Sequence, residues 1–292
     1  MPSINANGVS IEYEVHGAGA DRTMLLVNGL GSQLIAWDLG FCRYLVDRGF
    51  QVLTFDNRDV GLTSKSPVPL PADLWGAMAS LRSGTATEAP PYTLADMAAD
   101  GIAVLDAVGV ERAHVVGMSM GGMIVQRMAI DHPDLVLSMT SIMSTTGDTA
   151  VGQATPAAMA TLSTPAPSDR DGYIEHTVAN RQVISGSHYD PEYWRQMAPR
   201  FYDRSFHPPG PAYQLLAIAA DGDRTAELRQ LRVPTLVIHG RLDPLVTLSG
   251  GEATAAAVPG AELLVIDEMG HDIHPPLWAP IGDAIAALAD RA

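Results

Sequence analysis

Residues 113–129 read AHVVGMSMGGMIVQRMA, and this stretch decides the fold. Its first five residues have the length and apolarity of a buried strand, and residues 122–129 have the pattern of a helix. Between them lies Gly117-Met118-Ser119-Met120-Gly121, a G-x-S-x-G sequence. In this strand-turn-helix context it predicts a sharp turn with the serine exposed at its tip, facing the N–H groups that open the helix. We therefore expect Ser119 to be a nucleophile.

The composition indicates a globular protein that does not bind nucleic acids or membranes. The chain has 292 residues, 47% of them hydrophobic and 17% charged, and its formal net charge is −15. Such a charge repels nucleic acids and anionic lipid surfaces, and no basic cluster offsets it. No apolar run approaches the roughly 20 residues of a transmembrane helix, and the first twenty residues lack the apolar core of a signal peptide. We expect a cytoplasmic monomer or homodimer that acts on a small molecule.

The single cysteine, Cys42, lies in an apolar helical stretch and is expected to be a buried small hydrophobe. One thiol cannot form an internal disulfide, and no Cys–His spacing of a metal site occurs. We therefore expect no metal ligands and no cofactor.

Six apolar runs of strand length are spread along the chain, as is typical of strands covered on both faces. They are residues 24–27, 52–55, 113–117, 136–142, 235–238 and 263–266. Helical patterns separate them, as at 93–108, where Thr93 and Asp96 predict an N-cap and Gly109 a stop. Residues 9–15 alternate in polarity, which predicts a half-exposed strand near a sheet edge. The alternation predicts an α/β fold with a mainly parallel central sheet.

Residues 145–213 interrupt this rhythm. The segment is rich in proline and aromatic residues, and it contains helical stretches at 172–184 and 191–202 but no buried strand. We interpret it as a helical cap inserted into a core formed by residues 1–144 and 214–292.

A serine nucleophile needs a base, and the base needs an orienting acid. In folds with this turn, the acid and then the histidine follow the serine along the chain. Asp243 comes after the apolar run at 235–238, and His271 comes after the next run at 263–266. Both are thus expected at the sheet edge that carries Ser119.

An oxyanion hole needs two backbone N–H groups. Met120, directly after the serine, predicts one donor. The second donor is expected to be the N–H group of Leu30, in the loop after the run at 24–27. Gly29 and Gly31 let the backbone of this loop approach the reacting atoms.

Five segments together resemble the α/β-hydrolase superfamily, and in particular capped esterases of the aclacinomycin methylesterase type. They are residues 28–29 (NG), 56–64 (DNRDVGLTS), 117–122 (GMSMGG), 240–244 (GRLDP) and 270–271 (GH). The resemblance spans most of the chain outside the cap. It implies the α/β-hydrolase fold, a Ser119–His271–Asp243 triad and no cofactor.

Two positions depart from the family pattern. The common His-Gly is Asn28-Gly29 here, and Asp59 stands where the pattern Asp-x-Arg-Gly has glycine. Since the oxyanion donor is a backbone group, we expect it to survive the first change. Asp59 is interpreted as a marker of the methylesterase-like branch.

Other residues offer alternatives for the base and the acid. His239 and His274 are rival bases, and His274, beside two prolines, is expected at the surface. Asp148 is the alternative acid, at a second position that the family uses.

Asp56 and Arg58 are interpreted as a charged pair that ties a turn under the site, with substrate contact as the alternative. Substrate contacts are assigned to Gly29, Met118, Met143 and Trp194. Other methionines and cap aromatics are candidates for either the pocket or the core. They are Met123, Met197, Met269, Tyr173, Tyr193 and Tyr202.

These residues predict a serine hydrolase that cleaves a carboxylic ester of a small, largely apolar or aromatic molecule through an acyl-enzyme on Ser119. Lactonase, carbon–carbon bond hydrolase and cofactor-free perhydrolase reactions use the same triad and remain alternatives. A ligand receptor on a retained hydrolase scaffold is an alternative of another class.

Overall fold

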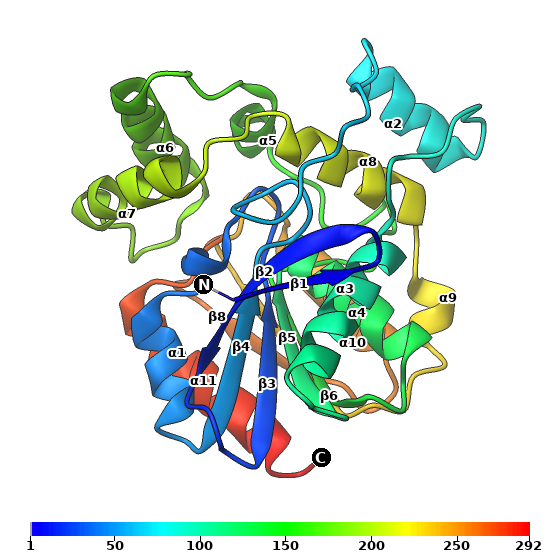
Figure 1. Ribbon diagram of the computed structural model, residues 1–292, viewed down its shortest axis with the longest axis vertical. Helices are drawn as coiled ribbons and strands as arrows, with labels where there is room; N and C mark the ends of the chain where they lie inside the picture. The colour runs from blue at the N-terminus through cyan, green and yellow to red at the C-terminus, as the bar shows by residue number, and fades with distance from the viewer. Residues whose placement is uncertain (1) are drawn as a thin grey trace.

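A computed structural model describes residues 2–292, and within them eight strands form one sheet (Figure 1). The strand order is β1-β2-β4-β3-β5-β6-β7-β8. β2 pairs antiparallel with β1 and β4, and every other neighbouring pair is parallel. The strands are β1 (Ser3–Ala6), β2 (Val9–His16), β3 (Arg22–Val27), β4 (Phe50–Phe55), β5 (Ala113–Met118), β6 (Val136–Ile142), β7 (Thr235–Gly240) and β8 (Glu262–Ile266). The predicted mainly parallel α/β sheet is confirmed.

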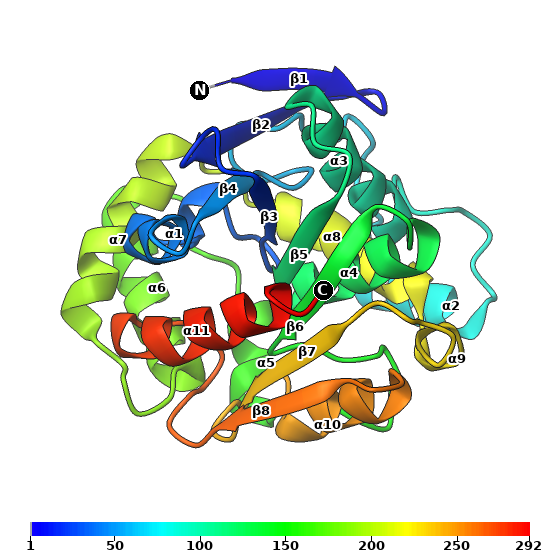
Figure 2. The same ribbon diagram turned by 90° about the horizontal axis from the view of Figure 1, so that it is seen from below.

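Helices cover both faces of the sheet, as the view from below shows (Figure 2). On one face α1 (Leu39–Val46) and α11 (Trp278–Ala289) share an apolar cluster with the strands. On the other face α3 (Leu94–Ala107), α4 (Met120–Asp131) and α10 (Leu248–Ala257) share the larger cluster. The remaining helices are η1 (Leu34–Ala36), α2 (Leu74–Ser83), α5 (Pro156–Ser163), α6 (Arg170–Ile184), α7 (Pro191–Arg204), α8 (Gly210–Asp221), α9 (Thr225–Leu228) and η2 (Pro275–Leu277).

The structure contains the helix cap, the helix stop and the buried cysteine that were predicted from the sequence. In α3 the Thr93 side chain accepts from the Asp96 N–H while the Asp96 side chain accepts from the Thr93 N–H, which completes a capping box. Gly109 follows with a φ of 73°, in the left-handed region that glycine favours. Cys42 is buried in α1, and this burial raises the pKa of its thiol to about 12.

The sequence analysis did not predict β1 or α2. β1 is four residues long and half exposed at the sheet edge, so it has no apolar run. In α2 only Met78 is buried, and the helix ends are defined by the Asp73 cap and by Gly84 in the left-handed conformation.

Helices α5 to α8 connect β6 to β7 and lie together over one end of the sheet (Figure 1). Within the described chain no strand lies between residues 143 and 234. α8 runs through residue 213, where the sequence analysis ended the cap. Val178, Trp194, Met197 and Phe201 form a separate small apolar cluster between α6 and α7.

The turn from β5 into α4 passes very close to β3. A Cβ added at Gly121 would lie 2.1 Å from the Val27 carbonyl oxygen, and one added at Gly117 would lie 2.0 Å from the Gly121 carbonyl oxygen. The Ser119 N–H donates to the Ile142 carbonyl at 2.9 Å, which ties the turn to the neighbouring β6. Only glycine fits at positions 117 and 121, because the obstructing atoms belong to backbone that cannot move aside.

We predict that Gly121→Ala destabilises the protein by more than about 3 kcal/mol, since the added methyl overlaps backbone and not a movable side chain. The free energy of unfolding from urea denaturation measures the effect. Gly101→Ala in α3 is the matched control: its nearest atoms are the ends of the Leu25 and Met128 side chains, at 3.3 and 3.4 Å. The control is expected to change stability by less than about 1 kcal/mol. Equal effects of the two substitutions would contradict the account of the turn.

Candidate active site

Ser119 lies between β5 and α4 with a φ of 56° and a ψ of −120°. Non-glycine residues rarely adopt such a conformation, and it costs about 1–3 kcal/mol. Its carbonyl accepts the N–H groups of Gly122 and Met123 at 2.9 and 3.3 Å, which opens the helix. The strained turn therefore holds the Ser119 side chain at the tip, at the N-terminus of α4.

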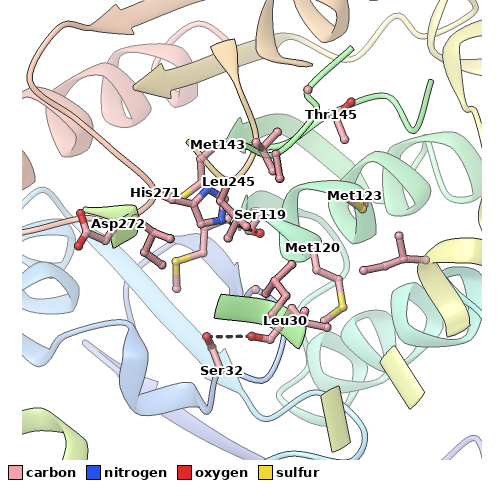
Figure 3. Close-up of a pocket in the computed structure, with 18 of the residues that line it drawn as sticks. Leu30, Ser32, Ser119, Met120, Met123, Met143, Thr145, Leu245, His271 and Asp272 are labelled. Atoms are coloured by element: carbon pink, nitrogen blue, oxygen red, sulfur yellow. Dashed lines mark hydrogen bonds between the residues drawn. The ribbon is translucent and has the colours of Figure 1, made fainter. Parts of the chain in front are cut away.

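His271 lies between Ser119 and Asp243. Figure 3 shows His271 beside Ser119. The His271 Nε2 lies 3.0 Å from the Ser119 Oγ, and its Nδ1 lies 2.7 Å from the Asp243 Oδ2. A carboxylate only accepts, so Nδ1 carries the proton and the Nε2 lone pair faces the serine hydroxyl. The structure thus brings together three residues that are far apart in the sequence.

Asp243 is oriented by its own loop after β7. Its Oδ1 accepts the backbone N–H groups of Leu245 and Val246 at 2.8 and 2.9 Å, so its Oδ2 is turned toward His271. The side chain is buried. These charge-assisted hydrogen bonds stabilise the ionised carboxylate beside the imidazole.

Leu30 and Met120 border the same cavity as Ser119 (Figure 3). Met120 is the first residue of α4, where N–H groups have no partner within the helix, and the Leu30 N–H donates no hydrogen bond within residues 2–292. A Cβ at Gly29 would lie 3.1 Å from the Ser119 Cβ, so glycine permits the close approach of this loop. Two free donors thus lie near the serine.

Helix α8 fixes the loop that carries Leu30. The Gln214 Oε1 accepts the Gly31 N–H at 2.8 Å, while the Gln214 Nε2 donates to the Arg58 carbonyl at 2.8 Å. The Gln214 side chain is fully buried. One amide therefore links α8 to two loops beneath it.

The prediction that Asp56 and Arg58 form a charged pair is wrong. Asp56 forms an ion pair with Arg204 at the end of α7, with an N–O distance of 2.7 Å, and its Oδ1 accepts the Leu34 N–H at 2.6 Å. Arg58 pairs with Asp100 of α3 at 2.6 Å. The two side chains thus connect their loop to different helices, and neither borders the cavity.

Asp59 stands where the family pattern has glycine, and its φ is 69°. That is the left-handed region, which glycine adopts at the least cost and aspartate tolerates. Its Oδ1 accepts the Ser66 N–H at 2.6 Å. The aspartate therefore keeps the backbone turn and adds a hydrogen bond to the following segment.

The loop with His271 is anchored to the end of α6. The His271 N–H donates to the Ile184 carbonyl at 2.7 Å, and the Ser185 hydroxyl donates to Asp272. His274 is buried, with its Nε2 2.8 Å from the Asp272 Oδ2, so its expected surface location is wrong. Packing against α7 covers it, with Tyr193 and Trp194 edge-on to its ring.

The structure does not place the rival residues at the serine. The His239 Nε2 donates to the Val246 carbonyl at 2.7 Å, and burial lowers the pKa of this histidine, which favours its neutral form. Asp148 borders the cavity, but its Oδ1 accepts the Ala150 N–H, and within residues 2–292 no hydrogen bond or ion pair joins it to a histidine.

A cavity of about 900 Å³ lies between the sheet edge and α5 to α8. Its wall includes Gly29, Met118, Met143 and Trp194, as expected. Met123, Tyr173 and Tyr193 also border it, whereas Met197, Met269 and Tyr202 do not. Met197 and Met269 belong to apolar clusters, and Tyr202 packs against Tyr173 and Phe206.

The sequence analysis missed Gln214 and Arg181, a further residue of the cavity wall. Gln214 carried no signal, because its partners are distant in the sequence. Arg181 lies on one face of α6 with Tyr173 and Thr177, and this helical spacing was visible in the predicted stretch at 172–184. Within residues 2–292 no group of three or more acidic, histidine or cysteine side chains is arranged to hold a metal ion. In the same residues no helix has the length and apolarity needed to cross a bilayer.

A family model for the alpha/beta hydrolase fold matches residues 22–276, and the chain belongs to this family. The protein is a hydrolytic enzyme, as the match and its curated relatives show.

Among the relatives, rhodomycin D methylesterase from Streptomyces peucetius is 27% identical over 311 aligned positions, which cover 98% of each chain. A 2-hydroxy-6-oxononadienedioate/2-hydroxy-6-oxononatrienedioate hydrolase from a Pseudomonas species is 27% identical over 272 positions, covering 88% of this chain and 84% of the relative. Among solved structures, a meta-cleavage product hydrolase from Pseudomonas fluorescens IP01 superposes with a TM-score of 0.76 at 20% identity, covering 100% of this chain and 98% of that one. The last comparison shows the shared fold.

Proposed function

We propose that the protein is a serine hydrolase that cleaves a carboxylic ester of a small, largely apolar or aromatic molecule. The observation that carries this proposal is the hydrogen-bonded chain from Ser119 through His271 to Asp243, at 3.0 and 2.7 Å. In the proposed mechanism Ser119 attacks the ester carbonyl as its proton passes to the His271 Nε2. Asp243 holds the imidazole in the required tautomer and stabilises its cation.

The developing oxyanion would be bound by the N–H groups of Leu30 and Met120. Each such donor contributes about 10²–10³-fold to the rate, because it is already oriented and no water has to rearrange. His271 then gives its proton to the departing alcohol, which leaves an acyl-enzyme on Ser119. A water transfers a proton to the Nε2 and attacks the acyl group, and the acid departs as Ser119 recovers its proton.

The cavity supports the substrate class. Among the described residues five methionines border it, and thioether side chains adapt to apolar and aromatic ligands. They are Met118, Met120, Met123, Met143 and Met159. The full-length relative that is a methylesterase supports an ester as the cleaved group. We assign Gly29, Met118, Met143 and Trp194 to substrate contact.

Helices α5 to α8 are proposed to act as a cap that selects the substrate. In this proposal the cap starts near residue 145 and includes all of α8, which ends at residue 221. Its helices supply one wall of the cavity and the sheet edge supplies the other.

Carbon–carbon bond hydrolysis is the second candidate, because a relative that aligns with 88% of this chain is named as a hydrolase of 2-hydroxy-6-oxononadienedioate, a compound with no ester or amide in its name. The proposed triad serves both reactions. The ester reaction is the first candidate, because the methylesterase aligns with 98% of this chain.

A substrate panel tests the function. We predict that the wild-type enzyme turns over methyl and p-nitrophenyl esters many times, and that Ser119→Ala lowers kcat by at least about 10³-fold, because the nucleophile is lost. Lactones and vinylogous 1,5-diketones complete the panel and detect lactonase and carbon–carbon activity. Released acid is measured by pH-stat titration.

Ser32→Ala is the matched control for this substitution. It removes a hydroxyl from the same cavity wall, where Ser32 Oγ is 3.4 Å from the Leu30 carbonyl (Figure 3), and is expected to retain turnover. If the protein bound an ester tightly and stoichiometrically but turned over no ester, the proposed ester hydrolase would be refuted. That result would favour a ligand receptor on a hydrolase scaffold.

The acid is tested separately. Asp243→Asn is expected to lower kcat about 10³- to 10⁴-fold with the fold intact, because the asparagine stabilises the wrong imidazole tautomer. Asp148→Asn removes the alternative acid and is expected to keep most of the activity. Steady-state kinetics with a p-nitrophenyl ester measure both, and loss of activity in Asp148→Asn alone would assign the acid to that residue.

A further inference from the structure

Helix α6 presents a mixed polar face to the cavity. The residues of this face recur at helical spacing and all border the cavity: Tyr173, Thr177, Asn180, Arg181 and Ile184. Most of the wall near Ser119 is apolar, so a face with an amide, a hydroxyl and a guanidinium is a local exception. Among these groups Arg181 alone carries a charge.

Arg181 has aromatic packing but no hydrogen-bond acceptor. Its guanidinium carbon lies 4.1 Å from the centroid of the Trp194 ring, which is itself buried. Within residues 2–292 the guanidinium donates no hydrogen bond, although it has five N–H donors. Burial lowers its pKa and Asp272 opposes that shift, but an arginine side chain stays protonated in proteins. The charge is therefore held beside the cavity without a partner that accepts from it.

The nearby carboxylates are already engaged. Asp272 accepts from the Ser185 hydroxyl and lies 2.8 Å from the His274 Nε2. Asp38 accepts from the Gly40 N–H at 2.7 Å and from the Tyr193 hydroxyl at 3.2 Å. Neither carboxylate accepts a hydrogen bond from Arg181 within residues 2–292, so the guanidinium N–H groups remain available to a ligand in the cavity.

The other arginines of the cavity wall differ from Arg181. Arg224 is bonded to Asp221 and to the Gln126 Oε1 at 3.0 Å, so its charge is compensated within the protein. Arg82 is exposed to solvent at the end of α2. Arg181 alone combines burial against an aromatic ring with unused donors.

Arg181 also lies on the helix that anchors the loop of the proposed base. Its carbonyl accepts the Ser185 N–H at 2.8 Å, and Ile184, three residues along α6, accepts the His271 N–H at 2.7 Å. The Arg181 backbone therefore lies about one helical turn from the carbonyl that anchors the loop of the proposed base. Arg181 and Ser119 border the same cavity, so one ligand there can contact both side chains.

We propose that Arg181 is a specificity residue that binds the carboxylate of an anionic substrate, with an apolar or aromatic spacer between this carboxylate and the scissile ester. This inference rests on the proposed function. Guanidinium and carboxylate match in a bidentate geometry, and Trp194 holds the guanidinium plane in place. Because the net charge of −15 disfavours anions in general, a preference for one requires such a local cation.

Monomethyl terephthalate and dimethyl terephthalate test the proposal, since they share ring and ester and differ in one charge. The readout is the ratio of their kcat/KM values. The wild type is expected to prefer the monomethyl ester, and Arg181→Gln is expected to lower the ratio at least about tenfold, mainly through KM. Arg181→Lys keeps the charge and is expected to retain part of the preference. Arg195→Gln, which removes an exposed cation from α7, is the matched control.

Two results would overturn the proposal. One is that Arg181→Gln leaves the ratio of the two kcat/KM values unchanged. If both kcat/KM values fall by the same factor, Arg181 has a structural role. The other is a wild-type preference for the dimethyl ester.

A binding measurement separates this proposal from the proposed function. Isothermal titration of terephthalate into Ser119→Ala, and into Ser119→Ala combined with Arg181→Gln, requires no turnover. At least tenfold weaker binding to the double variant supports the anion site, even if neither ester is hydrolysed by the wild type. Equal affinity, or no binding to either protein, overturns it.

Discussion

The close contact between the β5–α4 turn and β3 is the constraint on which the site depends. Gly121 lies against the Val27 carbonyl, and Gly117 lies against Gly121, with no room for a side chain at either position. The contact leaves Ser119 at a φ of 56°, a conformation that only a tightly packed surrounding maintains. It also places the loop after β3, with Gly29 and Leu30, next to the serine. The proposed nucleophile and the proposed oxyanion donors therefore depend on the same close contact.

The helices between β6 and β7 complete this arrangement from above. Three loops that follow strands of the sheet each contact one of them: Gln214 of α8 bonds to Gly31, Arg204 of α7 bonds to Asp56, and Ile184 of α6 bonds to His271. These contacts join the helices to backbone next to the proposed catalytic groups. A change in the position of α6 would thus move both the cavity wall and the histidine loop, which would couple the proposed substrate selection to the geometry of the site.

The sequence predicted what depends on local pattern and chain order. The sheet strands are apolar runs, the turn at Ser119 is a short motif, and Asp243 and His271 each follow a strand, so their common location follows from parallel strands. Contacts between distant segments were not predictable in the same way. The Asp56–Arg204 pair joins residues 148 positions apart, and the pairing of Asp56 with Arg58 was wrong because neighbours in sequence were assumed to be partners. The surface location predicted for His274 was also wrong, because α7 covers this residue and no pattern near it in the sequence indicates that contact.

The central claim is that the strained turn makes Ser119 a reactive nucleophile through His271. Reaction with a fluorophosphonate, followed by mass mapping of the adduct, tests this claim most directly, because the reagent requires an activated hydroxyl and no knowledge of the substrate. The account predicts one adduct per chain, on Ser119, and none in His271→Ala. An adduct on another residue, or undiminished labelling of Ser119 without His271, would contradict it.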